Sequence, residues 1–466
     1  MSKPFISQSY FKIIMCGLLV ALSGCNRIVD LPVAKGYSAK FLCSAVFNSG
    51  FDEAFIRDEI VAPAMQPLPL FWQTDVNYEE KMVTVGDVFF GTQFAAATAI
   101  YREGIGCTLL GNRSIEEVDA QAFVPLDAPP LPSDQPWPQG SGGLYPDVIP
   151  GLDTVAVDMA VANAFLGENE SRNTTSVVVV YDGKLIAEQY GIGATAQTPM
   201  IGFSMTKSVS STLIGIAQDL DLIDINDPAP ITEWQGTAKE MIQTKHILHM
   251  AAGLDFIEDY AGWSDVTQML FAESDQAVYA AARPLVNIPG DVFNYSTGEA
   301  NLLARIVQDA AGGSLQEAYD FYQTQLFHKI DIRSAFIEFD ASGRFVGGAF
   351  GHMTARDWAR LGQLYIQSGD WFGEQVVSAE WMEFALTPSP AADFYGAQIW
   401  LNTDGGEWPE LPEDAYHFSG FQGQQVIIIP SQKLVVVWTG MNISRDGTGH
   451  YVDEILSIIA ALPDSL

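Results

Sequence analysis

A serine stands one helical turn ahead of a lysine in this chain of 466 residues, and a long apolar helix pattern follows it. Ser204-Met205-Thr206-Lys207 comes after an apolar Ile201-Gly202-Phe203 segment. A helical run over 208–220 then carries apolar residues at i, i+3 or i+4 spacing: Val209, Leu213, Ile216, Ala217 and Leu220. Residues three apart on a helix share a face, so the Lys207 amine can reach the Ser204 hydroxyl. Burial and the positive helix N-terminus both favour a neutral amine, which can activate the serine as a nucleophile.

Two further segments extend this pattern along the chain. Asn294-Tyr295-Ser296-Thr297 follows the turn Pro289-Gly290-Asp291 and precedes a helical pattern over 300–311. Near the C-terminus, Ser419-Gly420-Phe421-Gln422-Gly423-Gln424 leads into an apolar strand over 425–429. The order Ser-x-x-Lys, then Tyr-Ser-x, then a Gly-rich segment on a strand resembles that of the serine β-lactamases and penicillin-binding proteins.

The resemblance covers residues 173–462 and is closest to the β-lactamase-related serine hydrolases. That group holds class C β-lactamases, related esterases and nylon-oligomer (aminohexanoate-dimer) hydrolases. Residues 245–254 are similar to its hLLxHxSGL segment, and residues 353–362 to its S/T-A-x-D-hA-R-h-G helix. Glu258-Asp259-Tyr260 resembles the nylon-oligomer hydrolase branch, in which the tyrosine contacts the substrate amide. The resemblance implies a serine hydrolase with a β-lactamase/transpeptidase-like fold.

The same resemblance gives the motif residues their expected roles. Ser204 is the nucleophile and Lys207 its base. Tyr295 passes a proton to the leaving amine or alkoxide, because a phenol beside a cation can have its pKa lowered. The backbone N–H groups of Ser204, at the helix start, and of Phe421, on the edge strand, are the expected oxyanion donors. Substrate contacts are expected from Tyr260, Ser419 and Gly420.

Two departures from the family pattern bear on the substrate. Penicillin-binding enzymes usually carry Lys-Thr-Gly or His-x-Gly on the edge strand, where the cation binds a substrate carboxylate. Here the triplet is Phe418-Ser419-Gly420, with His417 one place too early, and Thr297 stands where β-lactamases have Asn. We therefore predict cleavage of a linear amide or a simple ester. The alternatives are a β-lactamase or D-Ala-D-Ala carboxypeptidase, and a non-catalytic penicillin-binding-like module of the cell envelope.

The charge and the histidines limit the partners. Lys+Arg number 23 against 57 Asp+Glu, a net charge of −34. So acidic a surface repels phosphate, which argues against binding of nucleic acid or anionic lipid. It fits either a cationic substrate or a solubilising surface for a salty habitat. His246 and His249 fall at i, i+3 without a third ligand, and no dinucleotide fingerprint appears, so we expect neither a metal nor a cofactor.

Residues 1–25 are predicted to be a lipoprotein signal peptide. A basic start precedes an apolar run over 13–22, which is too short to span a bilayer. Leu22-Ser23-Gly24-Cys25 resembles the bacterial lipobox, in which the cysteine becomes the acylated first residue, and Asn26 resembles the outer-membrane sorting pattern. We expect a lipid anchor at Cys25 on the periplasmic side of the outer membrane. An ordinary signal peptide with an incidental cysteine is the alternative.

Two cysteines are left once Cys16 leaves with the signal peptide and Cys25 takes lipid. They are Cys43 and Cys107. Beyond the inner membrane the compartment is oxidising, and two leftover cysteines there most often bridge. We predict a disulfide between them, with two free buried thiols as the alternative.

Three segments follow the signal peptide. Residues 26–124 lie outside the family resemblance and have no role that we can assign beyond packing on the main domain. Residues 125–150 hold eight prolines and Gly140-Ser141-Gly142-Gly143, which predicts a linker or a strap across the surface. Residues 151–466 form the predicted hydrolase domain.

The hydrolase domain has strand patterns at both ends and helical patterns between them. The predicted elements are a hairpin of 176–181 and 184–190 around Asp182-Gly183, a hairpin of 424–429 and 434–439, and a final helix over 451–462. This order predicts an α/β (α+β) domain, in which one antiparallel sheet is flanked by helices and carries an inserted helical lobe. Ser204 is expected at the seam between sheet and lobe.

Overall fold

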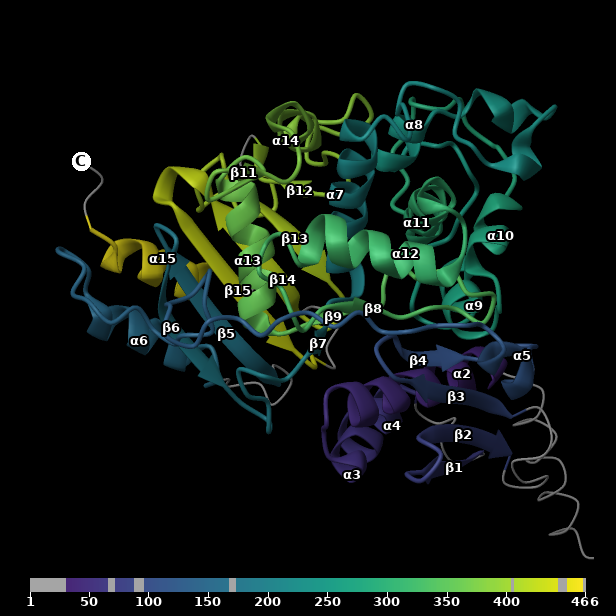
Figure 1. Ribbon diagram of the computed structural model, residues 1–466, viewed down its shortest axis with the longest axis horizontal. Helices are drawn as coiled ribbons and strands as arrows, with labels where there is room; N and C mark the ends of the chain where they lie inside the picture. The colour runs from purple at the N-terminus through teal and green to yellow at the C-terminus, as the bar shows by residue number, and fades with distance from the viewer. Residues whose placement is uncertain are drawn as a thin grey trace, which may run out of the picture.

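The computed structural model describes residues 31–65, 72–87, 96–166, 173–403, 406–442 and 451–463. The predicted signal peptide, residues 1–25, and the predicted lipidation site Cys25 lie outside these residues. Figure 1 shows a large part, built of a sheet, its helices and a helical lobe, with a smaller N-terminal part packed against it. No helix in the described part of the chain combines the length and apolar character needed to cross a bilayer.

The large part is built on a six-stranded antiparallel sheet with the order β12-β13-β14-β15-β5-β6. The strands are β5 (Thr174–Tyr181), β6 (Lys184–Tyr190), β12 (Trp400–Leu401), β13 (Tyr416–Gly420), β14 (Gln424–Ile429) and β15 (Leu434–Gly440). Both predicted hairpins are confirmed, and they pair with each other through β5 and β15, where Val178 lies opposite Val437. Asp182 and Gly183 turn the first hairpin with φ values of 48° and 72°, the backbone that an Asp-Gly pair favours.

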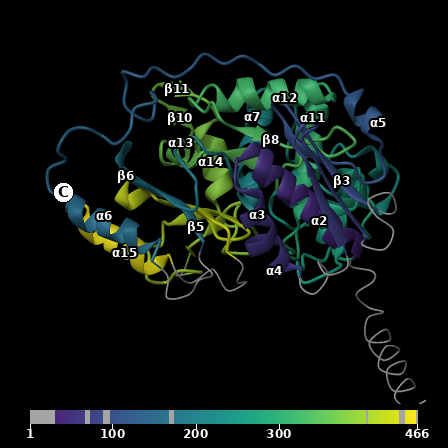
Figure 2. The same cartoon turned by 90° about the horizontal axis from the view of Figure 1, so that it is seen from below.

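Helices cover both faces of this sheet because its strands are apolar on both sides. Val178, Val180, Val435 and Val437 face the core beneath α13 (Ala355–Ile366). The alternate residues, Val177, Val179 and Val436 among them, pack against α6 (Thr154–Asn163) and α15 (Val452–Ala461). Successive strand residues point to opposite faces, so one valine-rich run supplies both layers. Figure 2 shows α6 and α15 side by side, and α15 confirms the helix predicted over 451–462.

A helical lobe is inserted between β6 and β12, as the sequence predicted, and stands beside the sheet in Figure 1. Its helices are α7 (Thr206–Asp219), α8 (Thr244–Leu248), α9 (Asp265–Phe271), α10 (Gln276–Ala281), α11 (Thr297–Ala311) and α12 (Leu315–Tyr322). Helix α11 begins three residues earlier than predicted, because the Ser296 hydroxyl caps it by accepting a hydrogen bond from the Glu299 N–H. This start places the Tyr295 motif at the N-terminus of a helix.

The described residues of the segment 31–124, which are 31–65, 72–87 and 96–124, form what we call the N-terminal module. Its helices are α2 (Leu31–Cys43), continued by a π-helical turn over Ser44–Asn48, α3 (Glu53–Phe55), a second π-helical turn over Ile56–Val61, α4 (Ala62–Ala64) and α5 (Ile115–Asp119). Its strands β1 (Trp72–Asn77), β2 (Met82–Asp87), β3 (Ala97–Arg102) and β4 (Gly106–Leu109) form an antiparallel sheet in that order. The predicted disulfide is confirmed: Cys43 at the end of α2 is bonded to Cys107 in β4, with their Cα atoms 6.1 Å apart.

The proline-rich residues 125–150 cross the surface of the large part as a strap (Figure 2). Arg360 of α13 fixes the strap by donating hydrogen bonds of 2.8 Å each to the carbonyl oxygens of Pro138 and Gly140. The indole of Trp137 donates in return to the carbonyl oxygen of Arg356, at 3.2 Å. Of the two structures predicted for this segment, the described chain adopts the strap, because an arginine fork satisfies its carbonyl groups.

Candidate active site

Ser204 lies in a 3-10 turn, Phe203–Met205, between the short strand β7 (Met200–Ile201) and helix α7. Strand β7 pairs with β9 (Gly351–Met353), which fixes the chain just before Ser204, the predicted nucleophile. Phe203 has a φ of 44°, a backbone conformation that is rare for a bulky residue. Phe203 and Met205 are buried, whereas Ser204 between them is partly exposed. The turn therefore presents the serine at the junction of sheet and lobe, where the sequence placed it.

Lys207 is the centre of the site. Only 1% of its surface is exposed, and its Nζ donates hydrogen bonds to Ser204 Oγ at 2.9 Å, Thr297 Oγ1 at 2.9 Å and the carbonyl oxygen of Gly348 at 2.8 Å. The predicted contact between lysine and serine is therefore present. Burial lowers the pKa of Lys207 to about 8, although the negative charge of Glu258 acts in the opposite direction. A lysine with this pKa can take a proton from a serine near neutral pH.

The third hydrogen-bond acceptor of Lys207 comes from the pair Gly347-Gly348, which follows β8 (Phe336–Ile337) in the chain. Gly348 leaves no room for a side chain, because a Cβ there would press against Thr297 and Asn301. The Asn301 side chain accepts a hydrogen bond of 2.9 Å from the Gly348 N–H and so orients this backbone. No role for Gly348 was predicted from the sequence. The signal available was the Gly347-Gly348 pair itself, since adjacent glycines often mark a close backbone approach.

Glu258 connects Thr297, in the motif that contains Tyr295, to Tyr260. Its carboxylate accepts hydrogen bonds from the Thr297 N–H at 2.9 Å, the Thr297 hydroxyl at 2.5 Å and the Tyr260 hydroxyl at 2.8 Å. The Thr297 hydroxyl therefore accepts from Lys207 and donates to Glu258. The sequence analysis treated Thr297 only as the loss of an asparagine and gave Glu258 no role. The sole hint was that a carboxylate stands two residues before the predicted substrate tyrosine.

Tyr295 lies beside the lysine, as predicted, but its pKa moves in the opposite direction from the one expected. Lys207 Nζ faces the ring of Tyr295, 4.9 Å from its centroid. Burial raises the pKa of Tyr295 and the charge of Glu258 raises it further, whereas hydrogen bonding to Ser204 lowers it. The expectation of a lowered pKa was wrong, because burial and the nearby carboxylate outweigh the hydrogen bond to Ser204. Tyr295 is therefore a neutral phenol, which can donate a proton.

A row of aromatic rings runs from Tyr260 through Phe421 to Phe203, the residue before Ser204. The Tyr260 ring stacks on Phe421 at a centroid distance of 5.4 Å, and Phe421 meets the edge of Phe203 at 5.5 Å. Phe421 lies in the turn that follows β13 rather than on the strand, which corrects the predicted position of this oxyanion donor. Gly420 packs so closely on the carbonyl oxygen of Gly202 that a side-chain carbon would collide with it. The two predicted oxyanion residues, Ser204 and Phe421, therefore belong to neighbouring segments.

The free end of β13 faces the site. Strand β12 pairs only with Tyr416 and His417, so Ser419 and Gly420 lie beyond the pairing and are partly exposed. The Ser419 hydroxyl accepts a hydrogen bond of 3.0 Å from the Gln425 side chain. This open strand edge can bind an extended substrate.

The side chains of two residues next to this strand edge, Phe418 and His417, are buried away from the site. Phe418, at the position of the family's cation, is fully buried and packs on Tyr365 of α13 at 5.0 Å. His417 is buried on the other face, against Trp408 at 4.2 Å, with its Nε2 3.4 Å from Glu407. These contacts give His417 a structural position, and in the site itself Thr297 links Lys207 to Glu258.

Comparison with known proteins covers most of the large part. Residues 160–445 match the model of the Beta-lactamase family. The 6-aminohexanoate-dimer hydrolase of Paenarthrobacter ureafaciens is 26% identical over 260 residues, which are 53% of this chain and 64% of that enzyme. This chain therefore matches slightly less than two thirds of that relative's length.

Solved structures share the fold at low sequence identity. A penicillin-binding protein homologue from Caulobacter crescentus superposes with a TM-score of 0.55 at 15% identity, covering 69% of this chain and 99% of that one. A family VIII carboxylesterase superposes with a TM-score of 0.53, also at 15% identity and over 69% of this chain and 99% of its own. The N-terminal module precedes the family match, which begins at residue 160.

Proposed function

This chain belongs to the Beta-lactamase family and is a serine hydrolase of that family, and we propose that it cleaves a linear amide or a simple ester through an acyl-enzyme on Ser204. The fold and family expected from the motifs are thereby confirmed. The observation that carries the proposal is the 2.9 Å hydrogen bond between Lys207 and Ser204, made by a buried lysine whose pKa is about 8.

The proposed reaction assigns one step to each polar group. Neutral Lys207 takes the proton of Ser204, and Ser204 Oγ attacks the carbonyl carbon of the substrate. The backbone N–H groups of Ser204 and Phe421 stabilise the resulting oxyanion. Tyr295 donates its phenol proton to the leaving amine or alkoxide as the scissile bond breaks, and the proton held by Lys207 restores the phenol. Water then attacks the acyl-enzyme, and the proton transfers of the first step run in the opposite direction to release Ser204.

The charges in the site favour a substrate without a carboxylate near the scissile bond. Phe418 occupies the family's cation position and is buried against Tyr365. Glu258 brings a negative charge beside Thr297 and Tyr260, where it would repel an anionic substrate. A buried carboxylate without a partner is costly, so a penicillin would bind poorly. The similarity to a 6-aminohexanoate-dimer hydrolase supports a linear amide.

Labelling with a fluorophosphonate probe tests the nucleophile. We expect one covalent adduct per folded molecule, located on the peptide that contains Ser204. The Ser204→Ala variant is the matched control and should remain unlabelled. Folded protein that forms no adduct on Ser204 would contradict the proposed chemistry.

A substrate panel tests the proposed class. It compares p-nitrophenyl esters of short acids, aminohexanoate dimer, nitrocefin and D-Ala-D-Ala peptides. We expect kcat/KM to be higher for the esters or the linear amide than for nitrocefin. Turnover of nitrocefin far above that of the esters and amides would instead support a β-lactamase.

We also propose that a lipid on Cys25 anchors the protein in the bacterial cell envelope, at the periplasmic side of the outer membrane. The lipobox-like Leu22-Ser23-Gly24-Cys25 supports this location. The Cys43–Cys107 disulfide supports it independently, since disulfides persist mainly in oxidising compartments outside the cytosol. The acidic surface then faces the periplasm and a small neutral or cationic substrate.

A further inference from the structure

The residue before the nucleophile is held in a rare backbone conformation by two rings. Phe203, with its φ of 44°, packs edge-on against Phe421 at 5.5 Å. The Phe203 ring also stacks in parallel on Phe41, with the ring centroids 6.2 Å apart and an angle of 7° between the ring planes. A strained conformation persists only where its surroundings hold it in place. Phe41 and Phe421 together provide such surroundings for the Phe203–Ser204 peptide.

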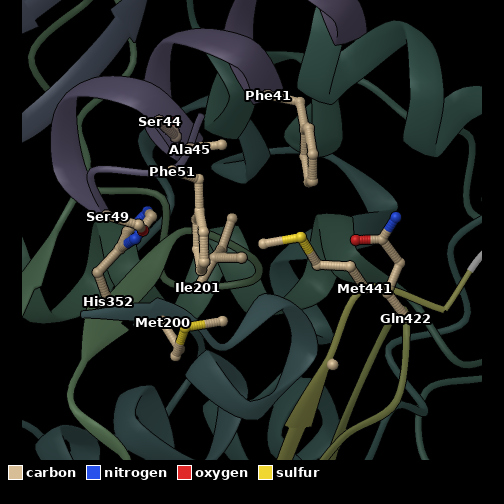
Figure 3. A pocket seen from close by; sticks show the side chains of 11 residues that line it. Phe41, Ser44, Ala45, Ser49, Phe51, Met200, Ile201, His352, Gln422 and Met441 are labelled. Atoms are coloured by element: carbon tan, nitrogen blue, oxygen red, sulfur yellow. The ribbon is translucent and has the colours of Figure 1, made fainter. Parts of the chain in front are cut away.

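Phe41 reaches this position from outside the family match. It lies on α2 of the N-terminal module, whereas the match begins at residue 160. Figure 3 shows Phe41 projecting from its helix towards a narrow pocket that separates the module from the sheet. Phe51, Ile201 and Met441 line the same pocket. Loss of the Phe41 ring would enlarge this open space next to Phe203.

A buried ionic cluster fixes α2 relative to the nucleophile. Glu338 forms an ion pair with Lys40 and accepts hydrogen bonds from Ser44 Oγ at 2.8 Å, Asn48 Nδ2 at 2.7 Å and the Cys107 N–H at 2.7 Å. All four donors belong to the N-terminal module. The acceptor belongs to the large part, so this cluster locks the residue next to Phe41 onto the hydrolase domain.

The same cluster connects to the nucleophile through a small sheet. Glu338 directly follows β8, which pairs with β9, and β9 pairs with β7 just before Ser204. The Cys43–Cys107 disulfide adds a covalent link between α2 and β4 on the side of the module. The position of Phe41 is therefore defined relative to β7, the strand that directly precedes the turn with Ser204.

We propose that Phe41 is a positioning residue, through which the N-terminal module holds the Phe203–Ser204 backbone in its reactive conformation. The proposal rests on the function proposed above, in which Ser204 is the nucleophile. Phe41 does not touch the reacting atoms and acts through Phe203. The N-terminal module is then a working part of the active site, and the hydrolase domain alone is an incomplete enzyme.

The test compares two phenylalanines of the same module. Phe41 and Phe51 are 6% and 7% exposed, and both line the pocket, but only Phe41 stacks on Phe203 among the described ring contacts. Phe41→Leu should lower kcat for a p-nitrophenyl ester about 10- to 100-fold with little change in KM, because small displacements of a catalytic group are costly. Phe51→Leu should keep kcat within about twofold, since the ring contacts described for Phe203 are with Phe41 and Phe421, and core changes without such a contact act mainly on stability.

Three further measurements separate positioning from general damage. Thermal unfolding should give similar losses of Tm for the two leucine variants. Phe41→Tyr, which keeps the ring, should recover most of kcat. The acidic limb of the pH profile should stay in place in Phe41→Leu, because Lys207 is held by Thr297 and Gly348, which Phe41 does not contact.

The outcomes distinguish the two proposals. Equal kcat values in Phe41→Leu and Phe51→Leu would overturn the positioning role while leaving the proposed function intact. If kcat and Tm fall together and to the same extent in both variants, the positioning role is likewise overturned and the proposed function stays intact. Retained activity in Ser204→Ala would instead overturn the proposed function itself.

Discussion

Lys207 and Thr297 lie 90 positions apart in the chain and are joined by a hydrogen bond of 2.9 Å that the lysine donates. The same threonine hydroxyl donates to Glu258, so one side chain connects the base of the site to a carboxylate. The protonation of Lys207 therefore depends on burial, which favours the neutral amine, and on Glu258, which favours the ammonium ion.

The first prediction concerns the pair that begins the reaction. Ser204→Ala should abolish hydrolysis of a p-nitrophenyl ester, and Lys207→Ala should nearly abolish it. The double variant should be no worse than Ser204→Ala, because members of one catalytic unit are not additive. Steady-state kinetics on all three variants checks this. Losses that simply multiply in the double variant would indicate that the two residues act independently.

The second prediction is a pH profile with a defined sign. Neutral Lys207 is the active form and its pKa is about 8, so kcat/KM should rise with pH and level off above about pH 8. In Glu258→Gln the carboxylate that raises this pKa is gone, so the rising limb should move to lower pH. Asp259→Asn removes a neighbouring, exposed charge and should leave the limb in place. A limb that moves to higher pH in Glu258→Gln would contradict the assignment.

The third prediction concerns the proton donor. Tyr295→Phe removes the phenol while keeping the ring that packs on Trp400 at 5.3 Å. We expect kcat/KM to fall by about 10²–10⁴, the usual contribution of a general acid. The loss should be larger for an amide than for a p-nitrophenyl ester, whose leaving group needs no proton. An unchanged rate for both substrates across the pH range would rule out a proton transfer by Tyr295.

The fourth prediction tests the buried cluster between the two parts. Lys40→Met leaves Glu338 buried without its ion-pair partner, so the free energy of unfolding should fall by about 3–5 kcal/mol. Lys81→Met, which removes an exposed lysine 3.7 Å from Glu103, should cost about 0–1 kcal/mol. Lys40→Met combined with Glu338→Gln should recover much of the loss. Urea unfolding measures all three, and equal effects of the two lysine variants would contradict the role of the cluster.

The same cluster sets a pH dependence of stability. Burial alone would raise the pKa of Glu338, but Lys40 and His352 lower it to about 2, below its ordinary value of 4.5. A carboxylate whose pKa is lower in the folded state binds fewer protons there than in the unfolded state. Its contribution is therefore complete above about pH 4.5 and is lost as the pH falls towards 2. Glu338→Gln should remove this part of the acid sensitivity in unfolding curves.

The fifth prediction concerns the anchor. Cys25→Ser should release the protein from the membrane fraction or block its processing, because acylation supplies the apolar contact with the bilayer. Cys16→Ser alters a cysteine within the signal peptide and serves as the control, with unchanged fractionation. Immunoblots of membrane and soluble fractions give the readout. Cys25→Ser protein that still fractionates with the membrane would count against lipidation at this position.

Much of this protein follows from local sequence patterns. The three-residue spacing from Ser204 to Lys207 brings the two side chains together because a helical turn has a fixed geometry. The Asp182-Gly183 turn, the two hairpins and the final helix obey rules that act over a few residues. Since these elements recur in a known order, the motifs also identified the family. The Cys43–Cys107 disulfide was predicted from the number of cysteines and from the expectation of an oxidising compartment.

Tertiary structure alone decided the properties that depend on distant segments. The pKa of Tyr295 rises because burial and the charge of Glu258 outweigh the hydrogen bond to Ser204, and no local pattern records how deeply a side chain is buried. The link from Lys207 through Thr297 to Glu258 joins three separate segments of the lobe. Phe41 reaches Phe203 across more than 150 positions, because an ionic cluster fixes helix α2 on the hydrolase domain. Sequence spacing determines which residues can meet within one element, whereas packing between elements determines the charges and rings that surround them.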